Sequence, residues 1–145
     1  MEPDDRGGKT LTAKEYLRRY QDANREINAL LKEIHNLRLL ATSITQGLSP
    51  DRVQTTPANR TESIISKIVD MEKEVDTRVD LLHSIKNEVM QTINAVEEPI
   101  CREVLIRRYI CGDTWEKIAV DMNYTYQWVC VLHGRALELI RIDSN

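Results

Sequence analysis

Two long segments of the chain carry apolar residues at alternating steps of three and four, and this spacing constrains the fold most. The first segment is the expected helix 12–46. Its stripe, which continues two residues beyond the helix, comprises Tyr20, Ala23, Ile27, Leu30, Ile34, Leu37, Ala41, Ile44 and Leu48. In the second, residues 61–96, it comprises Ile65, Ile68, Met71, Val75, Val79, Leu82, Ile85, Val89, Ile93 and Val96. A 3.5-residue repeat is typical of helices that pair along a narrow seam. We therefore expect an all-α protein in which residues 11–98 form a long antiparallel helical hairpin, a coiled-coil-like arm.

The ends of the first helix are marked in the sequence. Thr12 and Glu15 form a capping-box pattern, in which each side chain accepts a hydrogen bond from an amide at the helix start. Residues 47–60 contain glycine, two prolines and two threonines, and are expected to form a loop. Residues 1–10 contain structure-breaking glycine and proline, so we expect a disordered leader there.

Three polar residues of the arm have two interpretations. Asn24 and Asn28 beside the seam, and Arg78 within it, either set the register and dimer pairing or belong to a solvated edge. A two-helix seam buries little apolar surface, which favours self-association. A homodimer or higher oligomer through the arm is therefore a candidate assembly.

Pro99 opens a separate region, residues 99–145, because proline cannot continue the preceding helix but suits the first turn of a new one. Three short helices are expected there, at residues 99–110, 114–122 and 126–140, with residues 123–125 as a turn. Gly112 suits a left-handed helix cap, and either Asp113 or Thr114 caps the second helix.

The last two helices have the spacing of a helix-turn-helix. Small Ala119 permits close approach near a three-residue turn, and Val129 and Leu132 provide apolar contacts. The sequences VLIRRYICGDTWEKIA (104–119), YTYQWV (124–129) and RAL (135–137) resemble the C-terminal DNA-binding region of bacterial sigma factors, region 4. They also resemble sigma-like helix-turn-helix regulators encoded by phages and prophages, more loosely over the arm. The resemblance implies a DNA-binding transcription regulator that reads the major groove with helix 126–140.

The resemblance also assigns roles to residues of this sequence. Thr125 would cap the recognition helix, and the positions that face bases or backbone would be Tyr126, Gln127, Trp128, Cys130 and Val131. Gln127 can pair with adenine through its amide. The cations available for phosphate are Arg107, Arg108, Lys117 and Arg135.

The distribution of charge supports a second hypothesis. Residues 1–98 hold 14 Lys+Arg and 17 Asp+Glu, and residues 99–145 hold 6 of each, without the basic excess usual for a strong DNA binder. Trp128 and Val131 also differ from the arginine-rich recognition helices of sigma factors. The alternative is a helical adaptor that binds RNA polymerase or another regulator through a sigma-like fold. The expected partners are therefore double-stranded DNA and, for the arm or the adaptor, RNA polymerase.

Other classes of function are not favoured by the sequence. It contains no catalytic motif, membrane span or apolar signal core, so we expect a cytoplasmic protein of a bacterial host cell without enzymatic activity, cofactor or membrane contact. Cys130 and His133 share a helix face and, with Cys101 and Cys111, could in principle bind zinc, but the spacings match no zinc motif. Reduced thiols are the simpler interpretation. The acidic residues Glu72, Glu74, Asp76 and Asp80 are expected to form a solvated face, and Trp115 to lie in the core.

Overall fold

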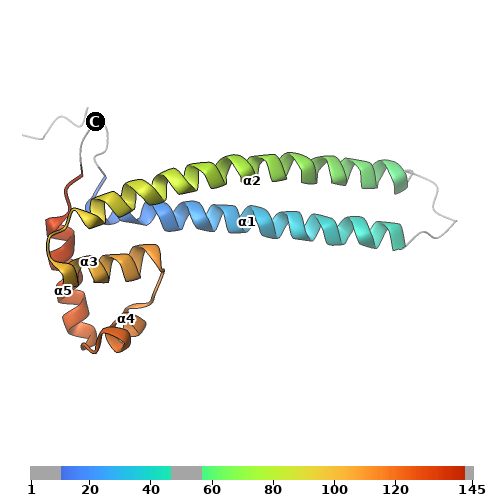
Figure 1. The fold of residues 1–145 in the computed structure, drawn as a ribbon. Coiled ribbons are helices and arrows are strands. Elements are labelled where there is room, and N and C mark those ends of the chain that lie inside the picture. Colours follow the sequence, from blue (N-terminus) through green and yellow to red (C-terminus); the bar gives the residue numbers. More distant parts are fainter. Residues whose placement is uncertain (1–10, 47–56, 143–145) are drawn as a thin grey trace, which may run out of the picture. The chain divides into compact units, whose positions relative to one another are not determined.

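The computed structural model describes residues 11–46 and 57–142, and all regular structure in this part of the chain is helical (Figure 1). The elements are α1 (Ala13–Gln46), α2 (Pro57–Asn94), α3 (Pro99–Leu105), the π-helix η1 (Ile106–Ile110), α4 (Trp115–Met122) and α5 (Tyr126–Leu139). The expected all-α fold class is confirmed. None of the helices in the described ranges combines the length and the apolar character needed to cross a membrane.

The predicted capping box starts α1. The Thr12 N–H donates to Glu15 Oε2 at 3.0 Å, and the Glu15 N–H donates to Thr12 Oγ1 at 3.2 Å. The second helix begins earlier than expected, at Pro57, so the predicted loop 47–60 is wrong for its last four residues. Proline lacks an N–H and has a helical φ, which suits a first helical position. The expected leader 1–10, the rest of that loop and Leu48 lie outside the described residues.

The packing divides the chain into two compact units, which are described separately. Among the described residues, the central unit comprises residues 23–46 and 57–83, and the terminal unit comprises residues 11–22 and 84–142. Both α1 and α2 therefore contribute to each unit. The sequence-based boundary at Pro99 coincides with a change of helix, whereas the packing of the terminal unit extends across it.

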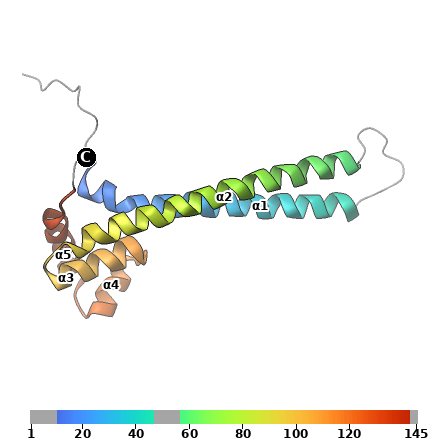
Figure 2. The same cartoon turned by 45° about the horizontal axis from the view of Figure 1, so that its top comes forward.

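The core of the central unit is a single seam between α1 and α2. The two helices lie side by side and run in opposite directions (Figures 1 and 2). The buried seam residues are Ile27, Ile34, Ile68 and Val75, with Leu30, Leu37, Ile64, Met71, Val79 and Leu82 partly buried against them. Ile65 is 51% exposed, so its predicted place on the stripe is wrong. Ile64 packs in the seam instead, because the steps 64, 68, 71 and 75 continue the heptad.

Ion pairs join the two helices on the flanks of the seam. The Arg78 guanidinium lies 2.8 Å from Glu26 of α1 and 3.0 Å from Glu74 of its own helix, and Arg38 pairs with Glu72. Arg78 is therefore not a buried polar residue in the seam. It joins the two helices across a partly solvated edge.

The terminal unit has a larger core that combines segments distant in sequence. Its main cluster comprises Leu17, Val89, Ile93, Val96, Cys101, Leu105, Tyr109, Ala136 and Ile140, most of them fully buried. A second cluster comprises Val104, Ile118, Ala119, Val129 and Leu132. Leu17 lies three residues before Tyr20, the first residue of the stripe that the sequence predicts. The contact of α1 with α5 therefore involves a residue that the sequence analysis did not include.

The helix that begins at Pro99 changes form before it ends. The expected helix 99–110 is helical throughout, but it is α-helical only to Leu105 and π-helical from Ile106, since the Cys111 N–H donates to the Ile106 carbonyl, the five-residue spacing of a π-helix. Gly112 follows with φ +74°, as its freedom from a Cβ allows. The Gln21 side chain of α1 donates to the Arg108 carbonyl at 2.6 Å. This hydrogen bond satisfies a carbonyl at the helix end, where no further turn is available.

Candidate nucleic-acid interface

The corner between α4 and α5 is formed by three residues. Asn123 adopts a left-handed conformation with φ 57° and ψ 41°, and the Tyr124 N–H donates to the Ala119 carbonyl at 2.9 Å. Thr125 is extended, and its hydroxyl accepts a hydrogen bond from the Trp128 N–H at 3.1 Å. Left-handed asparagine ends α4, and threonine caps α5, each with the conformation its side chain favours. The chain therefore turns within the predicted residues 123–125.

Both helices at this corner pack on the second core cluster. Ala119 of α4 is buried beside Val129 and Leu132 of α5. Thr114 caps α4, because its hydroxyl accepts a hydrogen bond from the Lys117 N–H at 3.2 Å. Of the two caps that the sequence left open, Thr114 is thus the one used. The small side chain at Ala119 lets α4 approach α5 closely.

The predicted reading residues lie on the solvent-facing side of α5. Val129, Leu132 and Ala136 point into the core, and the six residues Thr125, Tyr126, Gln127, Trp128, Cys130 and Val131 are all exposed. Trp128 is 45% exposed and Val131 56%, and Val120 of α4 is exposed as well. Gly134 lies on the same helix with open space where a Cβ would stand. The exposed residues of α5 thus include two large apolar side chains, Trp128 and Val131.

The four predicted phosphate-binding cations differ in their surroundings. Lys117 pairs with Asp121 at 2.7 Å and with Asp113 at 3.6 Å. Arg107 pairs with Glu103 at 3.0 Å, and Arg135 with Glu98 at 3.5 Å. Three of the four are therefore partly neutralised by carboxylates. Arg108 instead lies 4.3 Å over the ring of Trp115 and donates to the Asp113 carbonyl.

Two of these ion pairs also shift the pKa values of Lys117, Asp121 and Arg107. The hydrogen bond with Asp121 raises the pKa of Lys117, and the same contact lowers the pKa of Asp121. The hydrogen bond with Glu103 raises the pKa of Arg107. Lys117, Asp121 and Arg107 remain charged at neutral pH. Their pairing reduces the positive field available to an approaching phosphate.

A ring cluster beside α5 was not predicted from the sequence. The Tyr109 hydroxyl and Nε2 of His133 are hydrogen-bonded at 2.7 Å, and the rings of Trp115 and His133 lie 4.5 Å apart. Burial, followed by the positive charges of Lys14, Arg108 and Arg18, lowers the pKa of His133 to about 4. His133 is therefore uncharged at neutral pH. The only sign of this contact in the sequence is that His133 lies next to the buried positions of α5. Its partners Tyr109 and Trp115 come from other segments of the chain.

The cysteines do not converge on a metal site. Cys101 is buried, and burial together with a hydrogen bond to Glu98 raises the pKa of its thiol, whereas Cys111 and Cys130 are exposed. Among residues 11–46 and 57–142, no three His, Cys, Asp or Glu side chains gather closely enough to hold a metal ion.

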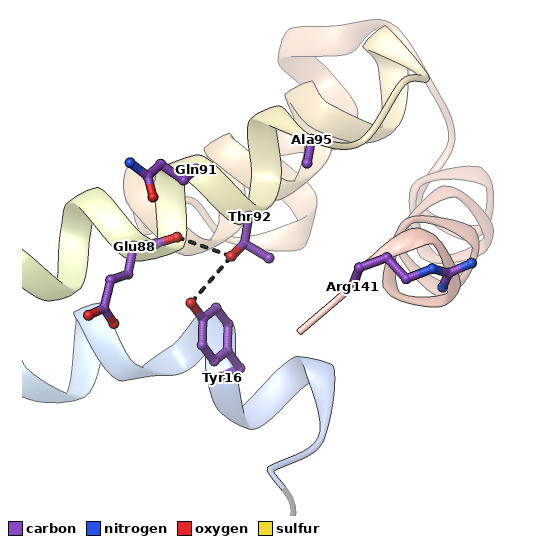
Figure 3. A pocket seen from close by; sticks show the side chains of 6 residues that line it. All are labelled: Tyr16, Glu88, Gln91, Thr92, Ala95 and Arg141. Carbon is purple, nitrogen blue, oxygen red and sulfur yellow. Dashed lines mark hydrogen bonds between the residues drawn. The ribbon is translucent and has the colours of Figure 1, made fainter. Parts of the chain in front are cut away.

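The terminal unit also has an open depression of about 380 Å³ near the start of α1 (Figure 3). Its lining residues are Tyr16, Glu88, Gln91, Thr92, Ala95 and Arg141. The Thr92 hydroxyl lies 3.3 Å from the Tyr16 hydroxyl, and Glu88 pairs with Arg19. The Arg141 guanidinium points away from the other side chains in this view. These residues form no nucleophile and base pair, so the surface of α5 is the better candidate site.

Comparisons with known proteins found no family model, curated protein or solved structure that matches this chain.

Proposed function

We propose that the chain is a DNA-binding transcription regulator, encoded by a phage or prophage and acting in the bacterial cytoplasm. In this proposal α3, η1, α4 and α5 form a helix-turn-helix domain like region 4 of sigma factors. Helix α5 lies in the major groove of double-stranded DNA. The proposal assigns the chain no enzymatic activity.

The α4–α5 corner is the observation that supports this proposal most. A left-handed Asn123, a capped α5 and a buried Ala119 support the proposal, because a helix-turn-helix needs a short turn between two closely packed helices. Because Gln127 is exposed on α5, its amide is available to the edge of an adenine.

The arm has a separate role in the proposal. We assign the paired parts of α1 and α2 as a helical hairpin that forms a homodimer or contacts RNA polymerase. Two domains bound together would gain affinity that one domain of neutral charge lacks.

The test is selection of binding sites from a random duplex library, followed by titration of the selected site. We expect Gln127→Ala to weaken binding of that site about 10-fold, because a bidentate base contact contributes about 1–3 kcal/mol. Glu138→Ala serves as the control, since it is exposed near the other end of α5. Failure to enrich any site, or equal affinity of wild type and Gln127→Ala, would contradict the proposed placement of α5.

The alternative function, a protein-binding adaptor, is favoured by a specific observation. Val120, Trp128 and Val131 are exposed, and an exposed tryptophan among apolar residues often marks a protein interface. Dependence on salt separates the two functions. Binding of DNA through several phosphates weakens steeply as salt rises, whereas an apolar protein contact does not. Capture of RNA polymerase that persists at 0.5 M salt and is lost in Trp128→Ala would favour the adaptor.

A further inference from the structure

Three side chains at the start of α1 lie on one line along the helix. Lys14, Arg18 and Gln21 are separated by four and three residues, so they share a face. The Gln21 amide contacts the Arg108 carbonyl of η1 at 2.6 Å. Leu17, adjacent to this line, is fully buried in the cluster that contains Ala136 of α5. The line therefore extends next to η1 and α5.

Arg108 joins the same location from the other side. Its guanidinium lies 4.3 Å from the centre of the Trp115 ring, and that ring lies 4.5 Å from His133 of α5. The positive charges that lower the pKa of His133, after burial, are those of Lys14, Arg108 and Arg18. All three cations therefore act on the same residue of α5, whose imidazole is uncharged at neutral pH.

These three cations differ in their pairing from three of the cations that the sequence analysis assigned to phosphate contacts. Lys117, Arg107 and Arg135 each have a carboxylate within 4 Å. Within the described ranges, no ion pair includes Lys14, Arg18 or Arg108. Lys14, Arg18 and Arg108 therefore carry positive charge that is not paired with a described carboxylate, and all three act on His133. His133 lies on a stripe of α5 that also contains Tyr126 and Cys130. These residues are spaced at steps of four and three.

From this arrangement we infer that Lys14, Arg18 and Arg108 bind the phosphodiester backbone of duplex DNA alongside α5. The inference rests on the proposed function and identifies which residues hold the phosphates. Backbone contacts fix the register and orientation of a reading helix, and cations on its flank are well placed to make them. Two of the three belong to α1, which the sequence analysis assigned to the arm. In this inference the ion-paired Lys117, Arg107 and Arg135 contribute less to phosphate binding than these three cations do.

The experiment is a salt titration of a fluorescent 30-base-pair duplex of random sequence with the full chain. Lys14→Gln/Arg18→Gln is the main variant, because both side chains are exposed and their loss leaves the core intact. Each phosphate contact contributes about 0.9 to the slope of log affinity against log salt. We expect the double variant to lower that slope by about 1.8, and to weaken binding roughly 10- to 100-fold at 0.1 M salt. Arg108→Lys keeps the charge and is expected to retain most of the wild-type slope.

Two further double variants control for general charge effects. Lys32→Gln/Lys67→Gln removes the same charge from exposed positions of the central unit and should leave the slope unchanged. Arg107→Gln/Lys117→Gln removes paired cations and should change it by less than Lys14→Gln/Arg18→Gln. Thermal melting of each variant verifies that it is folded.

The outcomes distinguish this inference from the proposed function. If wild type binds the duplex with a steep salt slope that Lys14→Gln/Arg18→Gln leaves intact, the cation cluster is wrong and the proposed function stands. An equal loss in Lys32→Gln/Lys67→Gln would also overturn the cluster, since the effect would then be one of net charge. Absence of salt-dependent binding by wild type would overturn both. Tighter binding of a matching RNA duplex, lost in the main variant, would overturn the assignment to DNA.

Discussion

The central and terminal units are built from the same two long helices, yet they differ in how deeply they bury apolar side chains. In the central unit, four residues are buried along one seam, and each retains some exposure. In the terminal unit, segments from α1, α2, α3, η1 and α5 enclose a core in which Leu17, Val89 and Ile93 are fully buried. A stripe that repeats unchanged along a helix therefore gives different packing, depending on whether other helices cover it. The predictions below test that contrast.

The largest effect is expected at Leu17. Its replacement by alanine leaves a cavity in the terminal core and should lower the free energy of unfolding by about 3 kcal/mol. Both tryptophans, Trp115 and Trp128, belong to the terminal unit, so their fluorescence reports its unfolding in urea. The exposed Leu31 offers a matched control, and Leu31→Ala should cost less than about 0.5 kcal/mol. Similar losses in the two variants would contradict the described packing of Leu17.

A smaller effect is expected in the seam of the central unit. Ile34→Ala removes a buried side chain that only one partner helix covers, so the site can partly collapse, and the loss should be about 2 kcal/mol. The measurement is urea unfolding followed by circular dichroism, compared with tryptophan fluorescence. We expect the fluorescence transition to shift less than the helical signal. Coincident shifts would show that the two units unfold as one.

Acid should destabilise the terminal unit through His133. The ordinary pKa of this group is 6.5, and the folded value is about 4, so the unfolded chain binds the proton first as the pH falls. The contribution is fully present above pH 6.5 and is lost progressively between pH 6.5 and 4. Because His133 is only partly buried, the loss should be roughly 1–2 kcal/mol, less than the full shift implies.

The measurement for His133 is the pH dependence of the tryptophan unfolding transition. His133→Gln should flatten it over this range, although Lys14, Arg18 and Arg108 still surround the site. The exposed His83 of the central unit is the control, and His83→Gln should keep the wild-type dependence. A wild-type transition that is constant between pH 6.5 and 4.5 would be incompatible with the described burial of His133.

The smallest effect is expected at Arg78. Arg78→Gln removes ion pairs with Glu26 and Glu74 on a partly solvated edge, and should cost no more than about 1 kcal/mol. Salt screens such pairs, so the difference from wild type should shrink in 1 M salt. Circular dichroism in urea at low and high salt measures it. A cost that stayed constant across salt would indicate packing by the aliphatic part of Arg78.

The features that depend on neighbouring residues could be predicted from the sequence. The capping box at Thr12 and Glu15 and the left-handed Gly112 follow from side-chain chemistry within one turn. Heptad spacing located most of the seam, and failed at Ile65 because two adjacent isoleucines both fit a helical stripe before the partner helix is known. The exposed face of α5 followed from the same periodicity.

The features that depend on tertiary contact could not be predicted. Gln21 and Arg108 are hydrogen-bonded although they lie 87 positions apart, and no local pattern connects them. The residue types at Ile106–Ile110 do not distinguish a π-helical turn from an α-helical one. The ion pairs of Lys117 are of a different kind, because both of its carboxylate partners lie four residues away and the sequence spacing alone permits the contacts. Arg135 pairs with Glu98 only because α5 packs close to the start of α3.

Gly134 makes α5 less stable than an alanine at the same position would. Glycine in the interior of a helix is less stable than alanine by about 1 kcal/mol, and at this position a methyl group would meet no atom within 4 Å. Gly134→Ala should therefore raise the melting temperature of the isolated chain. The same methyl group would stand on the exposed side of α5, where it reduces how closely another molecule can approach. Gly134→Ala is thus expected to raise thermal stability and to weaken binding at the exposed side of α5.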